Sequence, residues 1–448
     1  MNDEELAAKY EDRLRRYCGL TRMPRVCVEL TCDAHLVEKY AAQIGLMTAA
    51  SLLGRLFCEV QAIVPAVSLH PSIRHTERTL AAALNRELAR ARPAELRGPS
   101  AGSGPSRSLR VHFGCDHEAD VKYIGSGWTG IVGAEVETSD LREDENPFGP
   151  AMSAILASAE VFLLALDATH AVRAVSLNTW DWNLHPSGGP AWQEGLELGE
   201  VWTVGVGSVG SAALYFLNLS RLRLAVSLLD GDELKLENIS RSPIFSAEDK
   251  EGDAKVDVAA RYLRANGAVV RAAEAKWLHE SPLWASRMPG HPDLLISTAN
   301  EHHVRWHIES AYPPVQLHAS TGRNWQATLF RHIPIVDPCS LCIFPDEGVS
   351  APLTCATSEV VDHNTKKPVD ASLPFLSYAA GLMIAIEAFK LASGEHQTSR
   401  RIYLQTRGDP PVLCLPMSPL ATCSCRNRQA RLHLSAIEGS KFQSLSRS

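Results

Sequence analysis

The stretch VWTVGVGSVGSAALYF, residues 201–216, decides the fold of the second half of the chain. Apolar residues at its start predict a buried strand, and the small and apolar residues at its end predict a helix. Between them, Gly205, Gly207 and Gly210 have the spacing GxGxxG. Glycines at this spacing allow a tight turn and a close backbone approach, so that a phosphate can lie at the helix N-terminus. Because the pattern is common, the residues after it must decide which phosphate is bound.

A second strand and a set of charged residues follow the glycine turn. The strand LRLAVSLLD ends at Asp230, close to the acidic position that hydrogen-bonds a ribose in nucleotide-binding βαβ units. A nucleoside triphosphate needs cations for its phosphates and a carboxylate that can help to hold a metal ion, whereas a dehydrogenase has no such need. One short segment offers this set and favours ATP over NAD: Asp232, Asn238, Arg241 and Lys255.

Length and composition indicate a globular protein with two domains, which we place at 1–190 and 191–448. Hydrophobic residues make up 45% and charged residues 21%, and the net charge of -7 argues against a nucleic-acid partner. The charged N-terminus lacks the apolar run of a secretory signal, so we expect a cytoplasmic protein. The apolar segment 374–394 contains Glu387 and Lys390, and we predict a buried core helix rather than a membrane span.

The first half of the chain has the pattern of a mixed α/β domain. We expect strands at 60–69 and 108–114, and helices at 76–91 and 146–167. A second glycine cluster at 125–130 also matches GxGxxG, but the residues after it lack a helical apolar period. No helix N-terminus would then receive a phosphate, and we predict a turn between strands instead.

The motifs of the second half recur in a fixed order: GxGxxG, DxD, N-x-x-R, Lys and then CxxC. This order resembles the ubiquitin-activating enzyme superfamily, which includes the bacterial ThiF and MoeB adenylyltransferases, and the match covers about 200–426. These enzymes use ATP to form an acyl-adenylate at the C-terminal glycine of a ubiquitin-like protein. The resemblance implies a Rossmann-like fold with the glycine turn beside ATP and with Asp230 at the ribose. It also implies Asp232 near Mg2+ and phosphate, and Asn238, Arg241 and Lys255 on the phosphates.

One position departs from the family pattern. The family has Thr-Asp-Asn after a later strand, with the Asp on magnesium, whereas this chain has LLISTANEHH and therefore Ala299 at that position. A methyl group cannot bind a metal ion. Either Asp232, phosphate oxygens and Glu301 hold the ion, or the chain adenylates poorly. We expect retained activity, because Arg241 and Lys255 would have little purpose in an inactive domain.

Four cysteines resemble the zinc ligands of the same family. Cys339 and Cys342 form a CxxC pair, and Cys423 and Cys425 lie near the end of the chain. Four thiolates make a closed tetrahedral site with a structural role. The second pair has one intervening residue where the family usually has two, so Cys414 is an alternative ligand.

A long polar segment, 345–374, separates the two cysteine pairs. Loops of this length inside a domain are usually functional or mobile. Its cysteine, Cys355, matches the position that attacks the adenylate in ThiF-like enzymes. A thiolate is a strong nucleophile near neutral pH, and its thioester stays activated for transfer. The alternative is a polar-loop cysteine without a function.

The first half resembles the nucleotide-free copy of the fold that two-domain family members pack on the active copy as a pseudo-dimer. That copy lends an arginine to the ATP phosphates. The segment AAKYEDRLRRYCGL is similar to the family's segment and makes Arg13 the first choice, with Arg15 and Arg16 as alternatives. The layout is similar to activating enzymes of bacterial ubiquitin-like conjugation operons, including the BilD type of antiphage defence. It implies a ubiquitin-like protein and a conjugating enzyme as partners, and leaves further self-association open.

Two other functions remain compatible with these motifs. A sulfur-carrier activator of the ThiF or MoeB type uses the same adenylation and makes a thiocarboxylate, but such enzymes are usually shorter homodimers without the first 190 residues. A non-catalytic scaffold for a ubiquitin-like protein would explain Ala299. An oxidoreductase is disfavoured, because no hydride-transfer site is recognisable in the chain.

Overall fold

The structure of the chain is a computed structural model. It describes residues 2–98, 107–116, 118–133, 136, 144–184, 188–274, 292–299, 304–305, 308–309, 315–322, 325–333, 336–343, 372–395, 400–421, 423 and 440–446. Within these residues the strands form a six-stranded and an eight-stranded sheet.

The six-stranded sheet belongs to the first half of the chain and has the order β2-β1-β3-β4-β5-β6. The first four strands are parallel, and β5 and β6 are each antiparallel to the strand before them. Its strands are β1 (Cys27–Cys32), β2 (Glu59–Ile63), β3 (Ser108–Phe113), β4 (Val121–Ser126), β5 (Thr129–Val132) and β6 (Val175–Asn178).

The eight-stranded sheet belongs to the second half and has the order β14-β13-β12-β11-β10-β7-β8-β9. Strands β9, β8, β7, β10 and β11 are parallel, and β12, β13 and β14 alternate in direction after them. Its strands are β7 (Glu197–Val204), β8 (Arg223–Leu229), β9 (Val269–Glu274), β10 (Leu294–Ser297), β11 (Gln316–Gly322), β12 (Gln326–His332), β13 (Arg400–Gln405) and β14 (Val412–Pro416).

The two sheets repeat one topology. The order β2-β1-β3-β4-β5-β6 corresponds strand by strand, in order and direction, to β8-β7-β10-β11-β12-β13. A helix follows the first strand of each copy, α3 (Tyr40–Leu56) and α6 (Ser208–Leu219), and a long helix precedes the sixth, α5 (Phe148–Leu166) and α12 (Pro374–Ser393). The predicted fold class, a Rossmann-like domain preceded by an α/β domain of similar type, is therefore confirmed.

The remaining helices are shorter and lie around the two sheets. They are α1 (Asp3–Tyr10), α2 (Asp12–Cys18), α4 (Leu80–Ala91), η1 (Ala94–Leu96), α7 (Leu236–Ile239), α8 (Lys255–Ala265), α11 (Ser340–Ile343) and η5 (Gln443–Ser446). The predicted boundary between 190 and 191 falls in the connection from β6 to β7.

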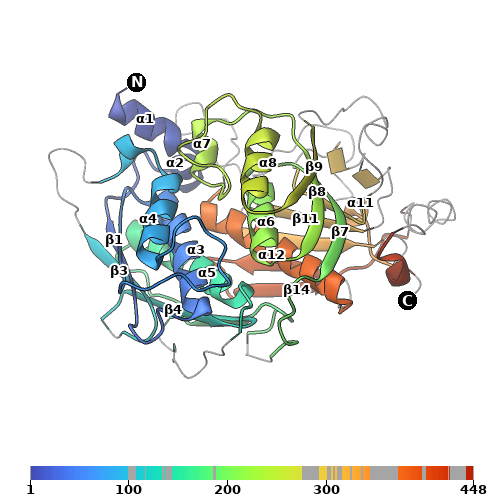
Figure 1. Ribbon diagram of the computed structural model, residues 1–448, viewed down its shortest axis with the longest axis horizontal. Helices are drawn as coiled ribbons and strands as arrows, with labels where there is room; N and C mark the ends of the chain where they lie inside the picture. Colours follow the sequence, from blue (N-terminus) through green and yellow to red (C-terminus); the bar gives the residue numbers. More distant parts are fainter. Residues whose placement is uncertain are drawn as a thin grey trace.

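The core lies between the sheets, where the long helices pack on one another. Figure 1 shows β1, β3 and β4 to the left and β7, β8 and β9 to the right of α3, α5, α6 and α12. Helix α12 contacts α6, α5 and α3, and one cluster of buried apolar side chains continues through both halves. The two halves therefore share a hydrophobic core, whose burial is the main favourable contribution to folding.

Two helices in the described residues, α5 and α12, are long and apolar enough to cross a membrane by length and composition. Both are largely buried in the core instead. The buried Lys390 donates to Glu387 at 2.7 Å, so the two charges of α12 satisfy each other. The prediction of a core helix at 374–394 is confirmed.

The second glycine cluster forms a strand turn, as predicted. Gly125 lies near the end of β4, and Gly130 lies in β5. Gly127, in the turn between the two strands, has φ +55°. A Cβ atom on Gly125 would lie 2.4 Å from the Cα of Pro150, so this glycine allows α5 to pack closely on the hairpin. The expected strands and helices of the first half also form, although the strand predicted at 60–69 is shorter, at Glu59–Ile63.

Candidate nucleotide site and cysteine cluster

The glycine turn joins β7 to α6, and its three glycines have different roles. Gly205 has φ +90°, which L side chains rarely adopt. A Cβ atom on Gly210 would lie 2.0 Å from the carbonyl oxygen of Gly205. Among the described residues, a Cβ atom on Gly207 would meet no atom within 4 Å beyond its chain neighbours. The fold thus requires the first and third glycines, whereas the second leaves open space at the N-terminus of α6.

Asp230 ties the end of β8 to this turn. Its Oδ2 accepts from the amide of Val206 at 2.6 Å, and its Oδ1 accepts from the amide of Asp232 at 2.8 Å. Burial raises the pKa of this carboxyl above its usual range, while Lys255 and the two amides oppose the rise. Asp230, which is predicted to bind a ribose, is therefore also a structural part of the turn.

Lys255 and Asp232 form an ion pair beside Asp230. The ammonium Nζ lies 2.6 Å from the Oδ2 of Asp232, and the backbone amide of Lys255 donates to the carbonyl of Asp232 at 3.0 Å. The lysine side chain is 8% exposed and the aspartate 75% exposed. A buried cation thus has one exposed carboxylate as its partner.

Asn238 and Arg241 follow on α7 and the loop after it. The Oδ1 of the buried Asn238 accepts from the amide of Lys235 at 2.9 Å and caps the start of α7. The amide of Arg241 donates to the carbonyl of Asn238 at 3.3 Å, so the two residues are held in one turn. Arg241 is half-buried.

The N-terminal helices lie against this region. Helix α1 contacts α7 of the second half of the chain. Lys9 at the end of α1 donates to Glu251, also in the second half, at 2.8 Å. On α2, Arg13 is half-buried, with its Nε 3.7 Å from Asp12. The structure thus brings the helix pair that contains Arg13 beside the candidate phosphate segment. The alternatives Arg15 and Arg16 pair with Glu11 and Asp12, both within the N-terminal segment.

Ala299 lies at the end of β10, directly opposite the glycine turn. A Cβ atom on Gly205 would lie 2.9 Å from the amide nitrogen of Ala299, and Thr298 Oγ1 donates to the carbonyl of Gly205 at 2.8 Å. Ala299 is 9% exposed and belongs to an apolar cluster with Trp202 and Leu229. Ala299 thus lies beside the glycine turn and offers no carboxylate there. Glu301 lies outside the described residues.

Asp230 and Asp232 differ in whether their oxygens are available to a magnesium ion. Both oxygens of Asp230 already accept backbone amides, whereas Asp232 is exposed. Mg2+ often uses one or two carboxylates together with phosphate oxygens and water. Of these two residues, Asp232 is thus the one whose carboxylate could contact such an ion.

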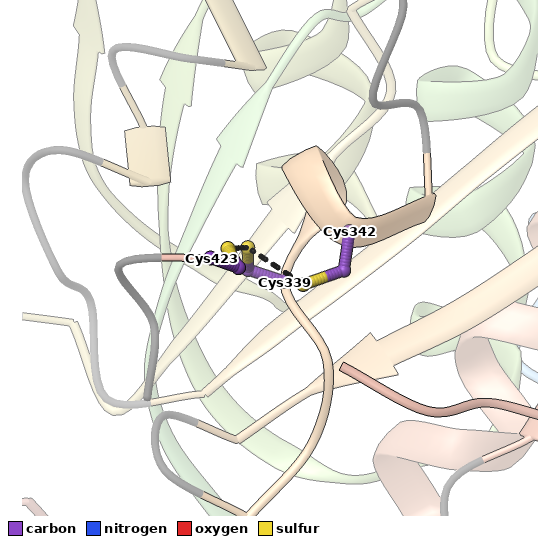
Figure 2. Close-up of side chains that lie close together, drawn as sticks. All are labelled: Cys339, Cys342 and Cys423. Atoms are coloured by element: carbon purple, nitrogen blue, oxygen red, sulfur yellow. Dashed lines mark hydrogen bonds between the residues drawn. The ribbon is translucent and has the colours of Figure 1, made fainter. Parts of the chain in front are cut away.

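Three of the predicted zinc ligands lie together (Figure 2). The Sγ of Cys339 lies 3.8 Å from that of Cys342 and 3.4 Å from that of Cys423, and the three sulfurs lie within 4.8 Å of one another. A zinc–sulfur bond of about 2.3 Å in tetrahedral geometry separates sulfurs by about 3.8 Å. The cluster therefore fits a zinc ion. Cys425 lies outside the described residues, and Cys414 lies on β14, outside this cluster.

Two buried carboxylates hold the backbone around Cys339, and no sequence motif indicated them. Asp337 Oδ2 accepts from Arg331 Nε at 3.1 Å and from the amide of Ile333 at 3.0 Å. Glu309 Oε1 accepts from the amide of Ser340 at 2.8 Å. These bonds fix both flanks of Cys339 before any metal binds, in the way that outer-shell groups orient metal ligands.

The first sheet has a carboxylate where the second has its glycine turn. Asp33 follows β1, accepts from the amide of Cys115 at 2.9 Å and lies 3.1 Å from the Nε2 of His112. A Cβ atom on Gly114 would lie 2.1 Å from the Oδ2 of Asp33, so the carboxylate fills this space. A negative charge here would repel a phosphate.

The fold and the site define a nucleotide-binding α/β domain preceded by a second copy of its topology without the glycine turn. The ThiF family profile matches residues 182–410, just over half of the chain, and the chain belongs to this family of adenylyltransferases. The profile of the BilD N-terminal domain matches residues 27–179. No curated protein matches the chain significantly.

Solved structures resemble the chain at low identity. Escherichia coli MccB with MccA-N7isoAsn is 19% identical, with a TM-score of 0.42, over 68% of this chain and 98% of that chain. E. coli MccB with ATP is 17% identical, with a TM-score of 0.40, over 68% and 97%. E. coli MccB with selenomethionine MccA is 17% identical, with a TM-score of 0.38, over 51% and 66%.

Proposed function

We propose that this chain uses MgATP to activate a ubiquitin-like protein. A carboxylate oxygen of the C-terminal glycine attacks the α-phosphorus of ATP, the bond to the β-phosphate oxygen breaks, and pyrophosphate leaves. The product is an acyl-adenylate. The observation that carries this proposal is the buried Lys255 held 2.6 Å from the exposed Asp232, next to Asp230, which binds the glycine turn at Val206.

The Lys255–Asp232 pair suits a triphosphate because it can exchange partners. On binding, Lys255 would turn from the carboxylate to a phosphate oxygen, and Asp232 would take part of the magnesium shell. Asn238 and Arg241 would contact the phosphates from the neighbouring segment. Fixed cations of this kind offset the repulsion between the incoming carboxylate and the α-phosphate.

The first domain supports a ubiquitin-like substrate over a sulfur carrier. The match to the BilD N-terminal domain, the repeated topology and the carboxylate of Asp33 all favour a nucleotide-free copy of the fold, packed on the active one. The divided arrangement, 1–190 and 191–448, is part of this proposal. Arg13 is then the residue that would reach the ATP phosphates from α2.

The second step of the proposal takes place on Cys355, which lies outside the described residues. Its thiolate attacks the acyl carbon of the adenylate, a thioester forms, and AMP leaves. The acyl group then passes to the cysteine of a conjugating enzyme. We place this pathway in bacterial antiviral defence, in the cytoplasm, with a structural zinc ion on Cys339, Cys342, Cys423 and Cys425.

Trapping the modifier tests this function. The purified chain, MgATP and the cognate ubiquitin-like protein should give an adduct that resists denaturant and disappears with added thiol. A Cys355→Ser variant should lose that adduct and still exchange pyrophosphate into ATP. A persulfide or thiocarboxylate product would instead identify a sulfur-carrier activator, and the absence of both adduct and exchange would identify a scaffold.

A further inference from the structure

Arg55, on the last turn of α3 in the first domain, is fully buried, and its guanidinium reaches into the second domain. Its Nε donates to the carbonyl of Ile239 at 3.1 Å. Its Nη2 donates to the carbonyls of Ser242 at 3.1 Å, Pro243 at 3.3 Å and Phe245 at 3.1 Å. Residues 239–245, which we call the Arg241 loop, are thus bound at four carbonyls by one side chain.

The remaining face of the guanidinium is held within the first domain. Nη1 of Arg55 donates to the carbonyl of Ser51 at 2.7 Å and to its Oγ at 2.9 Å. The same hydroxyl lies 3.0 Å from the hydroxyl of Tyr378 on α12. The guanidinium cannot move without losing several bonds, and a buried charge that loses its partners is strongly destabilised. Ser51 therefore holds one nitrogen of the guanidinium from within α3, apart from the loop that the other two nitrogens bind.

The four bonded carbonyls lie on both sides of Arg241. Ile239 precedes it by two residues and directly follows Asn238, and Ser242 is the next residue along the chain. Two residues with proposed phosphate contacts therefore have their backbone path set by a side chain of the other domain. Arg90 of α4, also in the first domain, binds the same loop, because its Nη2 donates to the carbonyl of Ile244 at 3.2 Å.

We propose that Arg55 is a positioning residue for the nucleotide site: it holds the Arg241 loop so that Asn238 and Arg241 face the ATP phosphates. The first domain then contributes to adenylation through the backbone of the second, without contact between Arg55 and the nucleotide. The kinetic part of this inference rests on the function proposed above, whereas the structural part does not.

Lysine is the informative substitution at this position. It keeps the charge, but its compact ammonium lacks the planar fork that spans Ile239 and Phe245 together. An Arg55→Lys protein should show a kcat/KM for ATP that is about tenfold to hundredfold lower, as expected when phosphate contacts shift by about 1 Å, with an unchanged KM for the modifier. Hydrogen exchange of amides within 238–247 should become faster in the protein without nucleotide.

Arg173 offers a matched control. It also connects the domains, since its Nη1 donates to the carbonyl of Gly408 at 3.0 Å and its Nη2 to that of Thr406 at 2.6 Å. These carbonyls lie in the connection between β13 and β14, which contains none of the proposed nucleotide residues. Arg173→Lys should leave both the kcat/KM for ATP and exchange within 238–247 as in the wild type.

Three measurements decide the proposal: pyrophosphate-exchange kinetics, equilibrium binding of MgATP and hydrogen exchange of the loop. Identical results for Arg55→Lys and Arg173→Lys in loop exchange and MgATP binding would overturn it. A wild-type protein without pyrophosphate exchange would contradict the proposed function instead, while loop exchange and MgATP binding would still decide the role of Arg55. If Arg55→Lys does not fold, Ser51→Ala replaces it, because this variant removes one hydroxyl acceptor and keeps the guanidinium. Ser51→Ala should change loop exchange and MgATP binding in the same direction by a smaller amount. No change in either measurement would refute the proposal.

Discussion

Two alanine substitutions in the glycine turn should separate folding from nucleotide binding. Gly210→Ala places a methyl group 2.0 Å from the backbone oxygen of Gly205 and 2.7 Å from the hydroxyl oxygen of Thr298. Gly207→Ala places one where, in the described part of the chain, no atom beyond the neighbouring residues lies within 4 Å, at φ -71°, which any residue adopts. We expect the first variant to lose stability and the second to lose affinity for ATP.

The expected magnitudes follow from these contacts. At Gly210 the overlap is with backbone, and overpacking of this kind costs about 1–3 kcal/mol. At Gly207, alanine is a poorer N-cap by less than about 1 kcal/mol, and the reduced freedom of the unfolded chain returns about 0.4–1 kcal/mol, so stability should barely change. A lost charge-assisted contact between the turn and a phosphate would weaken MgATP binding by about 1.5–3 kcal/mol, or roughly tenfold to hundredfold.

Urea unfolding and calorimetric titration with MgATP measure both effects on the same proteins. Gly207→Ala should unfold at the wild-type urea concentration and bind MgATP more weakly. Gly210→Ala should unfold at lower urea. The reasoning is refuted if Gly207→Ala binds MgATP as tightly as the wild type, or if Gly210→Ala is as stable as the wild type.

Three further predictions concern single side chains. Lys255→Met should lower the adenylation rate by about 10²–10³-fold, as for other groups that stabilise transition-state charge. Lys9→Met, at an exposed ion pair, should leave the rate unchanged. Equal rates of pyrophosphate exchange in the two variants would contradict the role of Lys255. Cys339→Ser should reduce bound zinc measured by mass spectrometry, whereas Cys414→Ser should keep it, and loss of zinc in Cys414→Ser would contradict the proposed ligand set. Burial holds the pKa of His318 well below its usual range, so its contribution to stability is present above about pH 6.5 and is lost as the pH falls. In the wild type the free energy of unfolding should therefore decline below that pH, and His318→Gln should flatten this decline by up to about 1.4 kcal/mol per pH unit. Parallel curves of unfolding free energy against pH for the two proteins would refute this.

The features that could be predicted from the sequence are those that local spacing determines. The turn at 205–210 has three glycines at fixed separations, because one needs a positive φ and another a close backbone contact. Cys339 and Cys342 are recognisable for a similar reason, since a short separation puts two sulfurs on one ion. The glycine cluster at 125–130 has the same spacing, but the residues after it distinguish it from a phosphate-binding turn, because they form a strand instead of a helix.

The features that could not be predicted depend on contacts between distant segments. Arg55 binds backbone carbonyls that lie 184 or more positions later in the chain, and a carbonyl is present at every residue whatever its type. Glu309 supports Ser340 in the same way, through a backbone amide. The carboxylate of Asp33 acquires its meaning only from the repeated topology, which places it where the second domain has its glycine turn.

The central claim is that the chain adenylates the C-terminus of a ubiquitin-like protein. Exchange of labelled pyrophosphate into ATP tests it most directly, with the purified chain, magnesium and a candidate ubiquitin-like modifier. We predict exchange that requires the modifier, that stops when its terminal glycine is removed, and that falls about 10²–10³-fold in Lys255→Met. Exchange that is absent with the modifier, or that is unaffected by loss of the terminal glycine, would contradict the account.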